Sequence, residues 1–138
     1  MANLNPLLEM ILRFFLATAL GAGIGYQRER AGKTAGLRTH MLVSSGAALF
    51  TLASIYGFSD ATADISRVAA AVVVGVGFIG GGVILRGAHG DEVAGLTTAA
   101  TIWVTAAIGL AAGAGMYLIS VLATAVIVGV LLLPKVRG

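Results

Sequence analysis

The sequence predicts an all-α, polytopic membrane protein with about five transmembrane helices, and three observations support this fold class. First, 58% of the 138 residues are hydrophobic and the mean hydropathy is +0.97, well above an average soluble domain. Second, only 11% of the residues are charged, and most of them lie between long apolar stretches. Third, several of these stretches approach the roughly 20 residues that a helix needs to cross about 30 Å of hydrocarbon.

The first predicted span covers residues 7–27, in which only Glu9 and Arg13 are charged. A cleaved signal peptide is the alternative interpretation, but such a peptide begins with a basic region, whereas this segment carries Glu9 near its start. Because Glu9 and Arg13 are four residues apart, they can pair on one helix face or extend toward the surface. The second predicted span covers residues 39–59 and contains no Asp, Glu, Lys or Arg.

The second half of the sequence contains three further predicted spans. Residues 68–85 are uncharged and long enough to form the third. The next uncharged run, residues 93–134, would be about 63 Å long as one helix, roughly twice the hydrocarbon thickness, so it must fold back. The segment "GAGMY" near its middle has the glycines of a turn, which places the last two spans at residues 94–112 and 116–133.

The residues outside the spans are too few for a soluble domain, so we expect residues 1–138 to form a single integral membrane domain. Lys and Arg accumulate in cytoplasmic loops because these cations resist translocation. Most of the basic residues fall on one predicted side, namely Arg28, Arg30, Lys33, Arg38, Arg86, Lys135 and Arg137. The opposite loop, residues 58–67, contains Asp60 and Asp64. We therefore predict an N-terminus outside and a C-terminus in the cytoplasm.

The segment "GYQRERAGKTAGLRTH", residues 25–40, is the strongest candidate for a functional site. Its simplest interpretation is a topology signal that also anchors to anionic headgroups, at about 1 kcal/mol per cation near the surface. The segment also contains a Glu between two arginines, two glycines that permit unusual backbone angles, and a Thr-His pair where the second span begins. Such a helix start can bind a phosphate, a carboxylate or an acidic protein surface. The candidate binding residues are Arg28, Glu29, Arg30, Gly36, Arg38, Thr39 and His40.

Small residues repeat along three of the predicted spans and indicate close packing, because helices in lipid associate through such residues. In the fourth span they recur every four residues from Thr97 to Gly113, so we expect this span at the centre. In the third span the run "GFIGGG" either packs or frees carbonyl groups to line a polar path. The residues assigned to helix packing or to a path are Gly77, Gly80, Gly81, Gly82, Thr97, Thr98, Thr101 and Trp103. Because five short helices cannot bury all these faces within one chain, we also expect a homodimer.

The sequence offers little support for an enzyme, a metal site or a nucleic-acid-binding protein. No Cys is present, so disulfides and thiolate metal sites are excluded. His40 and His89 have no adjacent nucleophile pattern and no metal-ligand spacing. The acidic pairs Asp60 with Asp64 and Asp91 with Glu92 fall in predicted loops, where solvation is the simpler interpretation. We therefore expect no catalysis, no cofactor and no nucleic-acid partner, and the metal ligands, if any, stay unassigned.

Three blocks of the sequence carry a family resemblance: "GYQRERAGKTAGLRTHMLVSSGAALF", "GVGFIGGGVILRG" and "GLTTAATIWVTAAIGLAAGAG". Together, from about Leu16 to Gly115, they resemble the membrane domain of the MgtC/SapB family. The resemblance implies a bacterial inner-membrane protein with about five spans, associated with adaptation to low magnesium, acid or intracellular stress. Many members also carry a cytoplasmic C-terminal domain, whereas we expect the membrane domain alone here.

Two hypotheses about function follow. The first is a non-catalytic membrane protein whose basic cytoplasmic loop engages an acidic membrane-protein partner or an anionic lipid. The second is a small transporter or channel for Mg²⁺ or another ion. Mg²⁺ usually contacts one or two carboxylates, and ionisable groups inside the bilayer mark ion paths. Since the predicted spans contain no carboxylate near mid-membrane, the sequence favours the first hypothesis.

Overall fold

The computed structural model describes residues 5–58, 64–87 and 95–134, and within these ranges it contains five α-helices and no β-strand. The helices are α1 (Pro6–Arg30), α2 (Leu37–Tyr56), α3 (Ser66–Gly87), α4 (Leu96–Gly113) and α5 (Tyr117–Leu131). The all-helical prediction is therefore confirmed. Residues named above that lie outside the described residues are Asp60, His89, Asp91, Glu92, Lys135 and Arg137.

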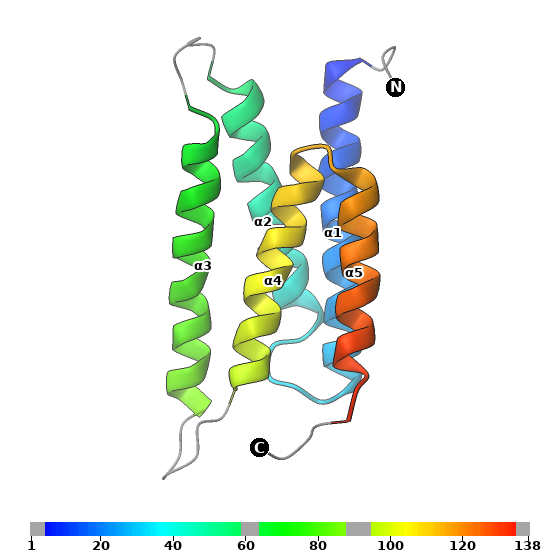
Figure 1. Cartoon of the computed structure of the whole chain (residues 1–138), viewed down its shortest axis with the longest axis vertical. Coiled ribbons are helices and arrows are strands. Elements are labelled where there is room, and N and C mark those ends of the chain that lie inside the picture. The colour runs from blue at the N-terminus through cyan, green and yellow to red at the C-terminus, as the bar shows by residue number, and fades with distance from the viewer. Residues whose placement is uncertain (1–4, 59–63, 88–94, 135–138) are drawn as a thin grey trace.

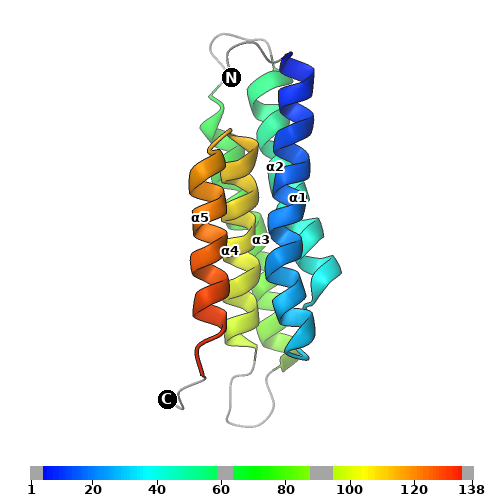
Figure 2. The same cartoon turned by 90° about the vertical axis from the view of Figure 1, so that its right-hand side faces the viewer.

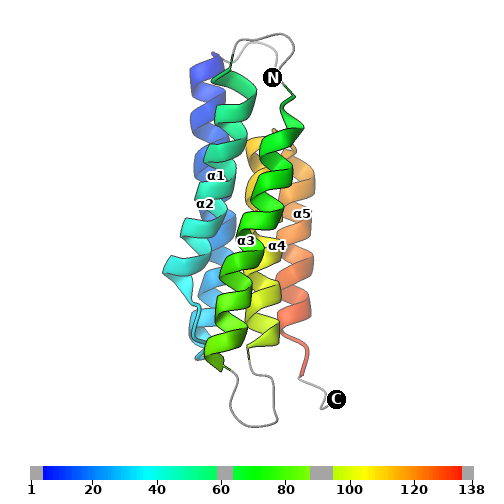
Figure 3. The ribbon, with the colours of Figure 1, turned by 90° about the vertical axis from the view of Figure 1, so that its left-hand side faces the viewer.

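The helices form an elongated bundle in which successive helices run in opposite directions (Figure 1). The central element is α4, which contacts each of the other four helices. Seen from one side, α1 and α5 flank it (Figure 2), and from the other side α3 lies in front of it (Figure 3). The predicted central position of the fourth span is confirmed.

The helix boundaries agree with the predicted spans to within three residues at every end. The largest differences are α1, which continues to Arg30 instead of ending at residue 27, and α2, which ends at Tyr56 instead of residue 59. By length and apolarity α1, residues 66–85 of α3, and α4 could each cross a membrane. The apolar α5 has only 15 residues, and α2 carries Arg38, His40 and several hydroxyl groups. A total of five crossings therefore stays a prediction.

Two tight connections depend on glycine. Gly32, between α1 and α2, has φ +73°, and Gly115, between α4 and α5, has φ +87°. Residues with a Cβ rarely adopt this left-handed region. The turn predicted at "GAGMY" is thus confirmed. Gly36, by contrast, has φ −112°, so it does not have the positive φ that makes glycine necessary.

Glycines of α4 bring its backbone directly against α2. A methyl group on Gly113 would lie 2.8 Å from the carbonyl oxygen of Ala48, and one on Gly109 would overlap the carbonyl oxygen of Ser44. Both contacts are closer than real Cβ atoms tolerate, so only glycine permits this approach. The four-residue spacing seen in the sequence therefore serves close helix packing, as membrane helices require.

The contact between α1 and α2 combines close backbone approach with a hydrogen bond. A methyl group on Gly21 of α1 would lie 2.7 Å from the carbonyl oxygen of His40. One turn further along α2, the Ser44 hydroxyl donates a hydrogen bond to the carbonyl oxygen of Ala17. Both contacts hold the two helices together along the first half of α2.

The ion pair predicted in the first helix is present. Arg13 Nη2 lies 2.7 Å from Glu9 Oε1, and Arg13 Nη1 donates a hydrogen bond of 3.2 Å to the carbonyl oxygen of Gly113. The guanidinium carbon also lies 5.5 Å from the ring centroid of Tyr56. Arg13 therefore supports the C-terminal end of α4, where carbonyl groups lack helical partners.

Candidate functional site

Arg28 is a buried cation near the C-terminal end of α1. Because α1 extends to Arg30, Arg28 belongs to the helix and not to the loop in which the sequence placed it. Only 3% of its surface is exposed. Its Nη2 donates a hydrogen bond of 2.7 Å to Thr98 Oγ1 at the start of α4. Arg28 therefore ties α1 to α4 and does not present its charge to solvent.

His40 is fully buried in the first turn of α2. Its Nδ1 lies 2.8 Å from the carbonyl oxygen of Gly36. A carbonyl oxygen can only accept, so Nδ1 carries the proton and Nε2 of a neutral ring is an acceptor. The backbone of His40 packs against α1, because a methyl group on Gly21 would lie 2.7 Å from the His40 carbonyl oxygen. We call Arg28, His40 and Thr98, which come from three helices, the buried polar cluster.

The buried polar cluster is incompletely satisfied. Within the described residues, Arg28 Nε and His40 Nε2 are buried and have no hydrogen-bond partner. Leaving such groups unpaired in an apolar interior is costly, so most buried polar groups in proteins have a hydrogen-bond partner. Close backbone packing surrounds the cluster, since a methyl group on Gly25 would lie 2.8 Å from Leu37 Cα. These features make the cluster the best-defined candidate site in the described residues.

Glu29 has a structural role at the start of α2. Its Oε1 accepts a hydrogen bond of 3.0 Å from the backbone N–H of Leu37. The N-cap residue Gly36 has no side chain to supply this bond, and a methyl group there would overlap Glu29 Oε1. Glu29 therefore caps α2 from the end of α1, and its negative charge also suits the positive end of the helix dipole.

Three cations remain exposed around this turn. They are Arg30, Lys33 and Arg38, which we call the basic surface. Arg30 Nη1 donates a hydrogen bond of 3.0 Å to the hydroxyl of Tyr26, while Thr39 is half-buried beside Arg38. The basic segment of the sequence thus divides into a buried cluster, a helix cap and an accessible cationic surface.

The residues assigned to packing or to a path do not gather at one place. Thr98 and Thr101 are buried in α4, whereas Thr97 and Trp103 are exposed. Among the four glycines assigned in α3, only Gly80 faces another helix, because a methyl group there would lie 3.6 Å from Ala99 Cβ. A methyl group on any of the other three would meet nothing within 4 Å: Gly77, Gly81 and Gly82.

Arg28, His40 and Thr98 were each identified from the sequence, but the contact between Arg28 and Thr98 was not predicted. Arg28 and Thr98 are 70 residues apart, and no local pattern connects them. The available cue was that an Arg three residues after Gly25 falls on the face of Gly21 and Gly25, the small-residue face of the first span. That face packs inward, so Arg28 had to be buried as well.

No group of three or more His, Cys, Asp or Glu side chains that could hold a metal ion occurs in residues 5–58, 64–87 and 95–134. The buried charged or titratable side chains within those ranges are Arg28 and His40. The interior at this end of the bundle is therefore cationic in character, which suits an anion or a neutral polar group better than a divalent cation.

Long apolar helices, small-residue contacts between them and a cationic end together define a helical membrane protein. The model of the MgtC family matches residues 14–137, and the chain belongs to this family. The resemblance stated from the three sequence blocks is thus confirmed.

Several curated proteins are similar to the chain. It is 52% identical over 115 residues to "Putative magnesium transporter YhiD" of Escherichia coli K12, covering 79% of this chain and 53% of YhiD. It is 44% identical over 117 residues to MgtC of Salmonella typhimurium LT2, covering 85% of this chain and 48% of MgtC. Protein SrpB of Synechococcus elongatus is 42% identical over 127 residues, covering 85% of this chain and 70% of SrpB. The chain thus spans about half the length of YhiD and MgtC, and no solved structure matches it.

Proposed function

We propose that this chain is a non-catalytic, multi-pass protein of the bacterial inner membrane that takes part in magnesium and stress adaptation. Its basic surface of Arg30, Lys33 and Arg38 lies in the cytoplasm and binds an acidic membrane-protein partner or an anionic lipid headgroup. Family membership and the name of YhiD support the link to magnesium. The observation that carries the proposal is the division of the basic segment, in which internal contacts use Arg28 and Glu29 but leave three cations exposed.

The alternative is a small transporter of Mg²⁺ or another ion, which the name of YhiD favours. A Mg²⁺ path would be expected to offer carboxylate oxygens, since Mg²⁺ is usually bound through one or two of them. Within the described residues the buried charged or titratable side chains are Arg28 and His40, and Arg28 would repel a cation. Transport is therefore the second candidate function.

Growth in low magnesium tests the proposal. Arg30, Lys33 and Arg38 are each replaced by Gln, singly and together, in a strain that depends on this protein. Because each cation contributes about 1 kcal/mol near an anionic surface, we expect a graded loss of growth with the triple variant most affected. The matched control is Arg67→Gln, an exposed cation at the opposite end of the bundle, which should grow as wild type. Normal growth of the triple variant at wild-type protein levels would contradict the proposal.

Liposome flux separates the two candidate functions. Purified protein is reconstituted into vesicles that enclose a Mg²⁺-sensitive dye, and an inward Mg²⁺ gradient is applied. We expect no flux above that of protein-free vesicles. Protein-dependent flux that is lost in Gly81→Leu would instead support the transport alternative.

The homodimer is also a proposal, supported by exposed glycines of α3. Gly77 and Gly81 are four residues apart on an exposed face, the spacing that lets membrane helices approach closely. Since the chain contains no Cys, single cysteines can be introduced freely. Gly77→Cys and Gly81→Cys should form disulfide-linked dimers in native membranes, whereas Gly23→Cys in α1 should not. Equal crosslinking at all three positions, or none, would contradict this interface.

A further inference from the structure

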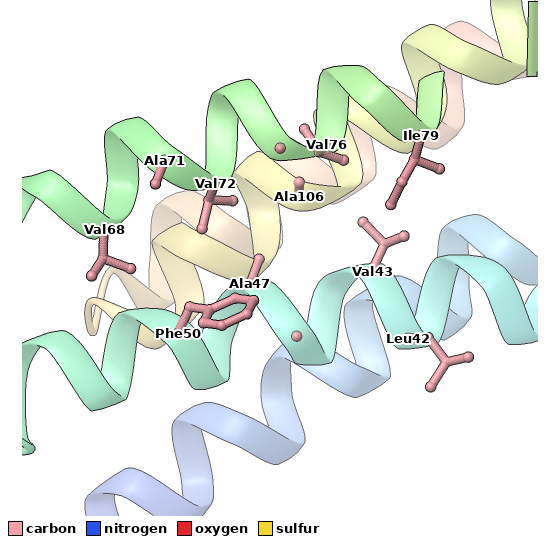
Figure 4. A pocket seen from close by; sticks show the side chains of 12 residues that line it. Leu42, Val43, Ala47, Phe50, Val68, Ala71, Val72, Val76, Ile79 and Ala106 are labelled. Atoms are coloured by element: carbon pink, nitrogen blue, oxygen red, sulfur yellow. The ribbon is translucent and has the colours of Figure 1, made fainter. Parts of the chain in front are cut away.

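A groove between α2 and α3 lies apart from the site described above. Its volume is about 590 Å³. In Figure 4 the two helices form its walls, and Ala106 of α4 lies behind them. Every residue that lines the groove is apolar, from Leu42 to Phe50 on α2 and from Val68 to Ile79 on α3. Such a surface offers water no hydrogen bonds, so its occupant is apolar.

The length of the groove fits one lipid chain. Its lining covers eight residue steps of α2 and eleven of α3, which is about 12 and 17 Å at about 1.5 Å per residue. One leaflet of the bilayer contributes about 15 Å, half of the roughly 30 Å hydrocarbon thickness. The groove is therefore about as long as the hydrocarbon layer of one leaflet is deep.

A cation lies beyond one end of the groove. Arg38 precedes the lining residue Leu42 by four residues, one turn or about 6 Å along the same side of α2. Its side chain is exposed. If a phospholipid phosphate is held there, the glycerol backbone that follows it can lead an acyl chain into the groove. A charge-assisted hydrogen bond to Arg38 would favour an anionic headgroup.

A helix from a second copy is a poorer occupant. Helices approach closely through small residues. The groove contains one such pair, Ala71 and Gly75, among bulkier lining side chains such as Phe50 and Ile79. A second exposed pair of α3, Gly77 and Gly81, is on another face. At about 100° per residue, Gly77 lies about 200° around the helix from the lining residue Gly75. A second copy packed on Gly77 and Gly81 would leave the groove open to lipid.

We propose that the groove binds an acyl chain of an anionic phospholipid whose headgroup lies at Arg38. The site holds one lipid at a defined place between α2 and α3, completing the weakly packed contact between these two helices. It shares Arg38 with the proposed basic surface, so it rests on the proposed function and deepens it by naming the lipid class that this residue recognises.

Photolabelling tests the site in the full chain. The protein is reconstituted in phosphatidylcholine nanodiscs that contain a small fraction of phosphatidylglycerol with a diazirine in the middle of one acyl chain. After irradiation, mass spectrometry maps the labelled residues. We expect labels concentrated between Val68 and Ile79 and between Leu42 and Phe50, and labelling about fivefold weaker when the same diazirine chain is on phosphatidylcholine. Labels spread evenly over all exposed helix faces would overturn the proposal.

Paired variants locate the chain and the headgroup. A leucine side chain at position 75 would extend into the open space of the groove, so Gly75→Leu should abolish groove labelling. Gly77→Leu also extends into open space but on another face of α3, so groove labelling should persist. Gly46→Leu fills the same groove from α2 and should also abolish groove labelling. Loss of labelling in both variants would not be explained by misfolding of one of them. Arg38→Gln should reduce phosphatidylglycerol labelling to the phosphatidylcholine level.

Three further outcomes are decisive. Efficient disulfide crosslinking of Gly75→Cys between two chains would place a second copy in the groove and overturn the proposal. If the triple variant of the basic surface grows normally in low magnesium while groove labelling persists in wild type, the proposed function fails and the lipid site stands. If the triple variant fails to grow but wild type shows no groove labelling, the reverse holds.

Discussion

At the scale of single residues, Arg28 shows how a charge can be held inside a membrane bundle. An ionised side chain is expensive in hydrocarbon unless it has partners, and the Thr98 hydroxyl supplies one at 2.7 Å. The hydrogen bond joins α1 to α4, so its effect is on tertiary packing and not on either helix alone.

A double-mutant cycle measures this bond. Arg28→Met removes the guanidinium while keeping an unbranched chain, and Thr98→Val removes the hydroxyl at constant shape. Because hydrogen bonds to charged groups contribute about 1.5–3 kcal/mol, we expect a coupling of that size in the free energy of unfolding in detergent. Strictly additive effects would mean that Arg28 and Thr98 do not interact.

Gly109 is the residue whose lack of a side chain matters most for the contact between α2 and α4. Gly109→Ala would place a methyl group into the carbonyl oxygen of Ser44 and within 2.9 Å of Ser44 Cα, both rigid backbone atoms. We expect unfolding free energy to fall by about 1–3 kcal/mol. Gly23→Ala is the control, since a methyl group there meets nothing within 4 Å, and it should be neutral or stabilising because Ala favours helix by about 1 kcal/mol. Equal stability of the two variants would contradict this account.

At the scale of elements, the start of α2 depends on a residue of α1. Glu29→Ala removes the acceptor of the Leu37 N–H, so we expect the first turn of α2 to fray. Amide hydrogen exchange at Leu37 should accelerate about fivefold, the equivalent of a cap worth about 1 kcal/mol. Gly36→Ala should have the same effect because its methyl group displaces Glu29, whereas Arg30→Ala should not. Unchanged exchange in Glu29→Ala would show that α2 needs no such cap.

The elements also differ in how well their positions could be predicted. Apolar length alone located all five helices, and the glycines of "GAGMY" located the turn that separates α4 from α5. The end of α1 was misplaced because Arg28 and Arg30 resemble loop residues by charge. Arg is nonetheless a good helix former and a cation suits the last turn of a helix, and in α1 the two side chains also contact Thr98 of α4 and Tyr26.

At the scale of the whole molecule, the alternating direction of the helices places the start of α1 and the end of α5 at opposite ends of the bundle (Figure 1). If the basic surface lies in the cytoplasm, as proposed, Phe58 at the opposite end of the bundle lies on the extracytoplasmic side of the membrane. In intact cells a membrane-impermeant maleimide should therefore label Phe58→Cys, and it should label Lys33→Cys only after permeabilisation. The native chain, which has no Cys, is the blank. The opposite labelling pattern would invert the predicted topology.

Length, hydropathy and local motifs were enough to predict that this chain forms apolar helices, where they begin and end to within a turn, and which family it belongs to. These properties are read along the chain and need no knowledge of how the helices pack. The burial of Arg28 and His40 and the hydrogen bond between Arg28 and Thr98 came from the packed bundle alone. Arg28 and Arg38 carry the same charge and are ten residues apart, yet their roles differ. Arg28 of α1 lies against α4 and is buried, whereas Arg38 of α2 is exposed.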